Sequence, residues 1–258
     1  MNALSYYTAA IQGNLYGIMI ALGVLAAIGV IWLETRRYGE KTDDILNLAL
    51  IVIPLGIIGA RLYHVIDRWD YFMAHPGEII GGQGLGIFGA VIAGAIGVII
   101  YTRIRKLSTL RWLDIISPGL LLAQAIGRWG NYFNQELYGY PTDLPWGIYI
   151  DPAHRLPGFE MYTTFHPLFL YESILNLAGF GLIMYLARRF SGWLYKGDVF
   201  LMYVIWYGVI RFILEGFKID VWTAAGFPVA RWITLFGVII ASIIFIIRHI
   251  YWRPKETI

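Results

Sequence analysis

A short polar run follows a long apolar segment near the middle of the chain. Residues 127–139 read Gly-Arg-Trp-Gly-Asn-Tyr-Phe-Asn-Gln-Glu-Leu-Tyr-Gly. Side chains such as Arg128, Asn131, Asn134 and Glu136 are costly in hydrocarbon, and within a membrane they usually face a protein-lined or watery cavity. Because a guanidinium fork matches the oxygens of a phosphate, this run predicts a polar site for an anion at a membrane boundary.

Further polar side chains occur within or at the edges of other apolar segments. Three of them are arginines: Arg61, Arg211 and Arg231. Others in comparable positions are Tyr16, His166, Glu172 and Glu215. Arg231 alone is equally consistent with snorkelling to the membrane interface. For Arg61, Arg128 and Arg211 together, a shared anionic ligand is the better prediction, and the phosphate most available at that depth is a phospholipid headgroup.

Some of these charges are expected to neutralise one another. Arg211 and Glu215 are four residues apart, which places them on one helical face and allows them to pair. His166, which precedes a proline, and the carboxylate of Glu172 also have structural interpretations, since buried charges generally need partners. Pairing alone does not explain why so many charges occur in apolar segments, so we keep the binding hypothesis beside it.

The composition favours a membrane protein. Of the 258 residues, 58% are hydrophobic and 14% are charged, whereas a soluble domain typically carries about 25% charged residues. The mean hydropathy is +0.61, and the net charge of +3 is small. The absence of cysteine excludes disulfides, cysteine-ligated metals and a covalent thioester on the protein. We find no metal-ligand constellation and no nucleotide-binding motif, so we expect no metal, no cofactor and no nucleic-acid partner.

Seven apolar stretches have about the 20-residue length of a transmembrane helix. They are residues 14–33, 44–66, 79–101, 112–130, 166–187, 198–216 and 230–250. We therefore predict an all-α polytopic membrane protein, with residues 1–258 forming a single integral membrane domain of seven transmembrane helices. The first stretch lacks a basic n-region and an evident cleavage site, so we expect it to be retained rather than removed as a signal peptide.

The distribution of lysine and arginine predicts the orientation. The loops that follow the second, fourth and sixth predicted spans lie on one side of the membrane. They carry only three lysines and arginines: Arg68, Arg155 and Lys218. The remaining loops and the C-terminal segment carry thirteen: Arg36, Arg37, Lys41, Arg103, Arg105, Lys106, Arg111, Arg188, Arg189, Lys196, Arg248, Arg253 and Lys255. The positive-inside rule then places the N-terminus outside and the C-terminus in the cytoplasm. This orientation places the arginines of the apolar segments near the outer leaflet.

Two connections have distinctive compositions. Residues 131–165 are long and rich in proline, glycine and aromatic residues, which predicts a small folded extracytoplasmic cap. The glycines from Gly81 to Gly86 are dense enough for a broken or re-entrant start to the third span. Those from Gly89 to Gly97 suit close packing of helices through small residues.

The polar run resembles the signature of the prolipoprotein diacylglyceryl transferase family, G-R-x-G-N-x-x-N-x-E-x-x-G. Other segments resemble the family's motifs in the same order, so the resemblance covers nearly the whole chain. They are Tyr16-Gly17, Gly59-Ala60-Arg61-Leu62-Tyr63, His166-Pro167 with Tyr171-Glu172, and Arg211-Phe212 with Glu215. The seven-span arrangement that faces outward is also similar to that of the family.

The resemblance implies a reaction at the outer face of the bacterial plasma membrane. The diacylglyceryl group of phosphatidylglycerol would pass to the thiol of the lipobox cysteine in a prolipoprotein signal sequence, forming a thioether and releasing glycerol phosphate. The catalytic residues implied are Arg128 and Arg211, with His166, Tyr16 and Glu136 as alternative general bases. The residues implied in binding phosphatidylglycerol are Arg128, Arg61, Arg211, Asn131, Asn134, Glu172, Glu215 and Gly139. The nucleophile would be the substrate's thiolate, so the protein itself needs no cysteine.

One position departs from the family pattern. Many members carry a histidine in the third span, often proposed as the general base, and Phe88 stands at the corresponding place here. Either the base lies elsewhere, or the thiol loses its proton without that residue, or activity is impaired. We favour the first two, because the signature and the arginines are intact. The alternatives are a non-catalytic carrier of phospholipid or lipopeptide and a transporter of an anionic solute; a transporter would be expected to show internal repeats and a midplane site, which we do not find.

Overall fold

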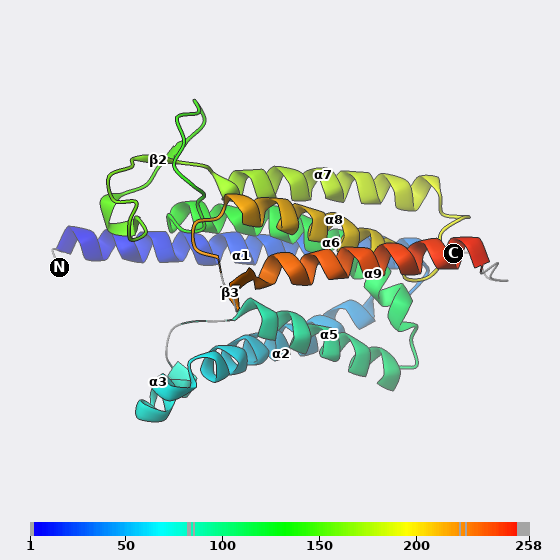
Figure 1. The fold of residues 1–258 in the computed structure, drawn as a ribbon. Helices are drawn as coiled ribbons and strands as arrows, with labels where there is room; N and C mark the ends of the chain where they lie inside the picture. The colour runs from blue at the N-terminus through cyan, green and yellow to red at the C-terminus, as the bar shows by residue number, and fades with distance from the viewer. Residues whose placement is uncertain (1–2, 82–83, 85, 222, 225, 252–258) are drawn as a thin grey trace. The chain divides into compact units, whose positions relative to one another are not determined.

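The computed structural model describes residues 3–81, 84, 86–221, 223–224 and 226–251, and helices dominate it (Figure 1). The α-helices are α1 (Ala3–Arg37), α2 (Asp43–Asp67), α3 (Trp69–Ala74), α4 (Glu78–Gly81), α5 (Ile87–Ile104), α6 (Thr109–Phe133), α7 (Leu168–Arg189), α8 (Asp198–Leu214) and α9 (Val229–Tyr251). Two short 3₁₀-helices are η1 (Pro152–His154) and η2 (Glu215–Phe217). The predicted helical class is confirmed for the bulk of the chain.

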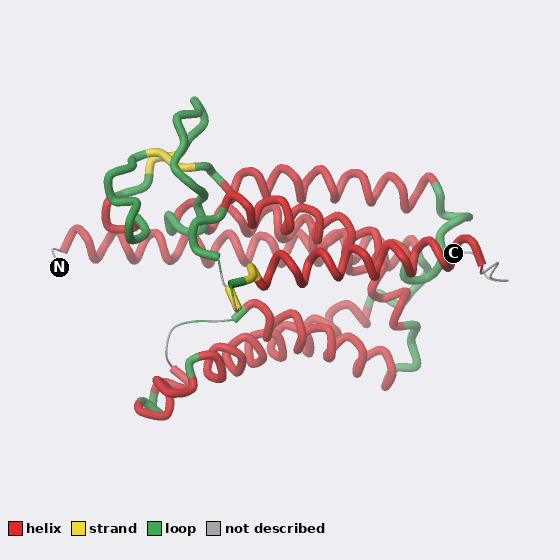
Figure 2. Tube along the Cα trace, viewed as in Figure 1, coloured by secondary structure: helices red, strands yellow, loops and turns green. Residues whose placement is uncertain are grey.

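The described residues also include four two-residue strands that the sequence did not predict. Strand β1 (Ile148–Tyr149) pairs antiparallel with β2 (Thr164–Phe165), and β3 (Thr223–Ala224) pairs antiparallel with β4 (Phe227–Pro228). Figure 2 shows both pairs in loops at the ends of helices. Strands of two residues carry too little alternation of polar and apolar side chains to be recognised in a sequence.

Five helical segments among the described residues are long and apolar enough to cross a membrane. They are Asn14–Arg37, Asp43–Asp67, Leu168–Arg189, Asp198–Phe217 and Val229–Tyr251. A shorter apolar helix covers Phe88–Ile104. The third predicted span, 79–101, is divided between α4 and α5, and residues 82, 83 and 85 of the predicted re-entrant segment lie outside the described part. The apolar helices indicate a multi-pass membrane protein, and the number of seven spans stays a prediction.

The chain divides into two compact units. One consists of Met1–Ile31 with Ile116–Ile258, and the other consists of Trp32–Ile115. In the first unit α7, α8 and α9 run side by side (Figure 1), with α8 in contact with both of the others. Its buried core includes Leu121, Ile183, Ala187, Leu194 and Val199.

The connection between α6 and α7 folds around a small core of its own. Tyr138, Ile150 and Phe165 are buried there. The hydroxyl of Tyr138 donates to the carbonyl of His154 at 2.7 Å and accepts from the N–H of Leu156 at 2.7 Å. Burial raises the pKa of the Tyr138 phenol, so it stays neutral and keeps its donor hydrogen. The position of this segment relative to the membrane stays a prediction.

In the second unit α2 packs directly against α5. A Cβ added at Gly59 would lie 2.3 Å from the Cβ of Ala93, and one added at Gly89 would lie 2.1 Å from the carbonyl oxygen of Gly59. The backbones approach so closely that no side chain fits between them. The prediction of close packing is therefore confirmed at Gly89.

We expect Gly89→Ala to destabilise the second unit. The added methyl collides with backbone, and overpacking of this kind costs about 1–3 kcal/mol. Gly94→Ala is the matched control on the same helix, because a Cβ there meets only Val52 Cγ1 at 3.7 Å. The midpoint of thermal unfolding in detergent should fall for Gly89→Ala and stay within error for Gly94→Ala. Equal midpoints for the two variants would contradict the packing described.

Candidate active site

Three helices of the first unit bring two arginines onto one carboxylate. Arg128 of α6 donates from Nη2 to Oε1 of Glu172 at 2.7 Å. Arg211 of α8 donates from Nη1 to Oε2 of the same carboxylate at 3.4 Å. Glu172 belongs to α7, so its two carboxylate oxygens link α7 to α6 through Arg128 and to α8 through Arg211. The sequence placed these three residues at one depth, and the structure brings them into contact.

A second carboxylate completes the charge balance of this cluster. Arg211 donates from Nη2 to Oε2 of Glu215 at 2.8 Å, which confirms the pairing expected from their spacing. Glu172 and Glu215 are only 4% and 5% exposed. Carboxylates removed from water to this extent need charged partners. With Arg128 included, two positive and two negative groups neutralise one another, and we call these four residues the arginine cluster.

The end of α6 extends the arginine cluster toward the surface. Arg128 donates from Nη1 to Oδ1 of Asn131 at 3.3 Å, and Nδ2 of Asn131 donates to Oε1 of Glu136 at 2.8 Å. Glu136 returns to this position because the chain turns sharply after the helix. Gln135 and Leu137 have φ of 50° and 55°, a left-handed conformation that residues other than glycine adopt only at a cost. Strained backbone of this kind concentrates at functional sites.

Tyr16 lies against the same end of α6. A Cβ added at Gly130 would lie 2.7 Å from Cδ2 of the Tyr16 ring, so the glycine makes room for the aromatic side chain. Tyr16 interacts electrostatically with Glu136 and Arg128. The structure therefore places two of the three predicted candidates for the general base, Tyr16 and Glu136, beside the arginine cluster.

The third candidate for the base, His166, belongs to a different hydrogen-bond chain. The indole N–H of Trp146 donates to the hydroxyl of Tyr171 at 2.8 Å, and this hydroxyl lies 3.0 Å from Nδ1 of His166. Tyr171 immediately precedes Glu172 in α7. These hydrogen bonds thus connect the α6–α7 connection to α7, the helix that carries the shared carboxylate, and they orient the imidazole ring of His166.

Gly139 closes the polar run against two other segments. Its N–H donates to the carbonyl of His166 at 2.9 Å, and a Cβ there would lie 2.7 Å from the carbonyl oxygen of Phe217. Only glycine fits this close approach. Asn134, also predicted in the site, donates its backbone N–H to the carbonyl of Gly130 at 3.1 Å, and its side chain is half-buried.

Arg61 and Phe88 belong to the other unit. Arg61 donates to the carbonyls of Ile79 at 2.8 Å and Gly84 at 2.9 Å, and also to that of Glu78. These bonds tie α2 to the segment that leads into α5. The ring of Phe88 lies 6.0 Å from the ring of Tyr63, centroid to centroid. A role for Arg61 in binding phosphate stays a prediction.

The sequence did not predict a series of polar side chains that continues from the arginine cluster. Tyr207 of α8 interacts electrostatically with Glu172, Arg128 and Arg211. Its ring stacks on that of Tyr203 with centroids 5.9 Å apart and planes 1° apart. The hydroxyl of Tyr203 accepts a hydrogen bond of 3.1 Å from Nε2 of Gln124. The available signal was spacing, because Tyr207 precedes Arg211 by one helical turn.

The geometry of the arginine cluster suits recognition of a phosphate. The side chains of Arg128 and Arg211 are 22% and 24% exposed, and their guanidiniums bind different oxygens of Glu172. Fixed cations in a site with little water interact with a developing negative charge more strongly than they would in solution. Carboxylates hold both guanidiniums before any ligand arrives, so their orientation is set in advance.

Residues 5–247 match the family described as prolipoprotein diacylglyceryl transferase. The chain belongs to this family. The family resemblance of the signature around Arg128 is thereby confirmed, and it extends over most of the chain.

Relatives with high coverage agree with this assignment. The chain is 41% identical over 243 residues to a protein of Lactococcus lactis subsp. lactis, which covers 91% of this chain and 89% of the relative. It is 40% identical over 244 residues to one of Streptococcus agalactiae, with 91% of each covered. It is 38% identical over 257 residues to one of Chloroflexus aggregans, covering 91% and 84%. Each of these relatives is named phosphatidylglycerol–prolipoprotein diacylglyceryl transferase.

We expect Glu172→Gln to destabilise the first unit strongly. The neutral amide leaves the arginine cluster with two guanidiniums and one carboxylate, that of Glu215, which pairs with Arg211. Breaking a buried ion pair from one side costs about 3–5 kcal/mol, and the partial exposure of both guanidiniums places the effect near the lower figure. The matched control is Glu160→Gln, since Glu160 is exposed and lies outside the cluster. Chemical unfolding of the two variants in detergent checks this, and similar midpoints would show that the carboxylate does not hold the helices together.

Proposed function

We propose that this protein transfers the diacylglyceryl group of phosphatidylglycerol to the cysteine thiol of prolipoprotein signal sequences. The thiolate sulfur attacks the glycerol carbon of the donor, and the carbon–oxygen bond to the phosphate breaks. A thioether forms, and glycerol phosphate leaves with the bonding electrons. The arginine cluster, in which Glu172 joins Arg128 of the family signature to Arg211, is the observation that supports this function.

In this proposal Arg128 and Arg211 bind the donor phosphate. The phosphate gains a negative charge as its bond to carbon breaks, and two oriented guanidiniums stabilise that charge as it develops. Glu172 and Glu215 hold the guanidiniums, while Asn131 links Arg128 to Glu136 through hydrogen bonds of 3.3 and 2.8 Å. Asn134 and Gly139 are further predicted ligands in the first unit, and the part of Arg61 in binding phosphatidylglycerol stays a prediction from the sequence.

The proton of the thiol passes to a base, and the contacts favour Glu136. This carboxylate is exposed, accepts from Asn131 and interacts electrostatically with Tyr16. It is therefore both joined to the arginine cluster and accessible to a substrate. His166, with Tyr171 3.0 Å from its Nδ1, is the second choice and Tyr16 the third. A base at one of these positions allows for Phe88 in place of the usual histidine.

We further propose seven membrane spans with the N-terminus outside and the C-terminus in the cytoplasm of a bacterium. The bias of lysine and arginine toward one set of loops supports this orientation. The α6–α7 connection then forms a cap on the outer face, next to the end of α6 that carries the signature. The partners are phosphatidylglycerol, signal peptides with a lipobox cysteine and membrane lipid.

Arg128→Gln should abolish transfer. The full-length protein is reconstituted with phosphatidylglycerol and a cysteine-bearing lipobox peptide, and the peptide mass is followed. The wild type should add one diacylglyceryl unit, whereas Arg128→Gln should lose at least about 100-fold in rate, the cost of removing one donor to a developing anion. Arg189→Gln, which removes an arginine at the other end of the bundle, is the control and should retain the wild-type rate. Bound but unmodified peptide with the wild type would indicate a carrier instead.

Glu136→Gln should slow transfer in a manner that depends on pH. Loss of a general base costs about 10²- to 10⁴-fold. A thiol ionises unaided near pH 8.5, so the deficit should shrink as the pH rises above that value. His166→Gln and Tyr16→Phe are measured over the same range. A deficit that shrinks only for one of these two would move the assignment of the base to that residue.

A further inference from the structure

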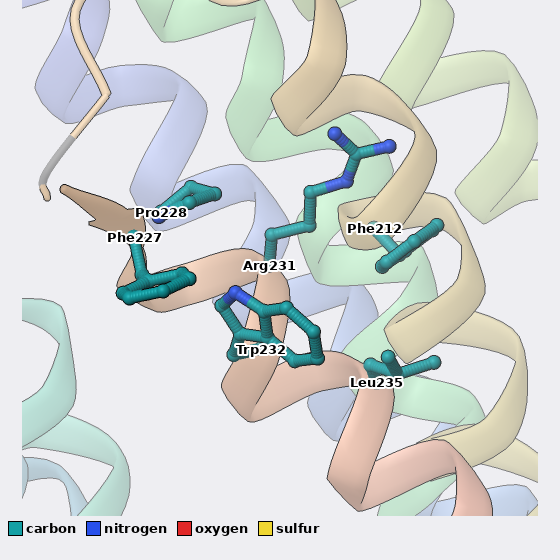
Figure 3. Close-up of a pocket in the computed structure, with 6 residues that line it drawn as sticks. All are labelled: Phe212, Phe227, Pro228, Arg231, Trp232 and Leu235. Atoms are coloured by element: carbon teal, nitrogen blue, oxygen red, sulfur yellow. The ribbon is translucent and has the colours of Figure 1, made fainter.

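A mostly apolar pocket opens between α8 and α9, away from the residues assigned above. Its volume is about 280 Å³, and its lining comes from α8, β4 and the first two turns of α9. Figure 3 shows the six lining residues: Phe212, Phe227, Pro228, Arg231, Trp232 and Leu235. Five of them are apolar or aromatic, and one is a cation.

The cation of this pocket is partnered differently from Arg128 and Arg211 of the arginine cluster. The Cζ of Arg231 lies 4.6 Å from the centroid of the Phe212 ring, a cation–π contact. Among the described residues no carboxylate forms a salt bridge with Arg231, whereas Arg128 and Arg211 both pair with Glu172. Arg231 is exposed, so its charge is available to an anion that approaches along the helix.

The surroundings of the pocket are those of a lipid-facing surface. Only 6% of the apolar window of α9 is buried inside the protein, so most side chains of this helix are not covered by the rest of the first unit. Phe227 and Trp232, at the rim, are 60% and 43% exposed. Aromatic side chains with an arginine beside them are typical of the level of the lipid headgroups.

Charge and shape together select one class of occupant. A free phosphate would satisfy Arg231 and leave the apolar walls in contact with water. A neutral hydrocarbon would contact the apolar walls and leave Arg231 without an anionic partner. A zwitterionic lipid carries a cationic amine beside its phosphate, which weakens the attraction to Arg231. An anionic diacyl phospholipid provides both an acyl chain for the pocket and a net negative headgroup for the guanidinium.

We propose that this pocket is a binding site for an anionic phospholipid, with one acyl chain between α8 and α9 and the phosphate on Arg231. The site is separate from the arginine cluster and does not depend on the proposed transfer reaction. Phe212 directly follows Arg211 in α8, so a lipid held here contacts the helix that carries a phosphate ligand of the proposed active site. The pocket would thus keep an anionic lipid on that helix.

Trp232 is a built-in probe for this proposal. The full-length protein is reconstituted in phosphatidylcholine vesicles that contain a fixed fraction of lipid with brominated acyl chains, which quench nearby tryptophan. The emission of Trp232 is obtained as the difference between each protein and its Trp232→Phe derivative. Brominated phosphatidylglycerol and phosphatidylserine should each quench this emission at about one-fifth of the concentration needed with brominated phosphatidylcholine, as expected for one arginine near an anionic headgroup.

Variants separate charge from shape. Arg231→Gln should abolish the five-fold preference, and Arg231→Lys should retain most of it. Leu235→Trp, measured as the same difference, fills the pocket without changing charge and should reduce quenching by every lipid. The matched control is Arg189→Gln, because Arg189 also lies over an aromatic ring, that of Phe190 at 5.5 Å, but at the far end of α7.

Equal quenching by anionic and zwitterionic lipids would overturn the proposal. So would a preference that survives Arg231→Gln, or one that Arg189→Gln removes to the same extent. A response to phosphatidylglycerol alone would also contradict it, since charge is what the pocket is proposed to recognise. No peptide is present in these measurements, so they stand whether or not the protein catalyses transfer.

Discussion

The packing of α6, α7 and α8 depends on the ion pairs that the carboxylate of Glu172 forms with Arg128 and Arg211. The two oxygens of this carboxylate bind guanidiniums from different helices at 2.7 and 3.4 Å. In an apolar bundle a charge without a partner is costly, so α6, α7 and α8 can adopt only those rotations that bring the three groups together. Glu215 balances the remaining charge. The same requirement that stabilises the helices therefore orients two cations toward one place.

This coupling of stability and orientation explains the rest of the proposed site. The guanidiniums are held before a phosphate arrives, so little reorganisation is needed when charge develops on it. The left-handed residues Gln135 and Leu137 bring Glu136 back onto Asn131, and Gly139 admits the carbonyl of Phe217 at a distance that no Cβ would allow. Backbone strain and a glycine contact thus position the end of the signature, where helix geometry alone would lead the chain away.

The four arginines of the apolar segments, Arg61, Arg128, Arg211 and Arg231, have similar sequence surroundings but different partners in the structure. All four interrupt apolar segments, and all were expected at one depth. Arg128 and Arg211 pair with a carboxylate, Arg61 donates to backbone carbonyls that connect α2 with α5, and Arg231 lies over an aromatic ring beside an apolar pocket. Hydropathy locates such residues, but the partner that determines the function of each comes from another segment of the chain.

The sequence by itself determined the helical class, the positions of the main apolar helices and the family, because hydrophobic length and the order of motif residues are local properties. It also predicted the pairing of Arg211 with Glu215, which one turn of helix brings together. Only the tertiary structure decided that Glu172 joins two helices, that Tyr207 lies beside the arginine cluster and that His166 is oriented by Tyr171 with Trp146. These contacts join residues distant in the chain or depend on side-chain direction, and both follow from how helices and loops pack rather than from spacing.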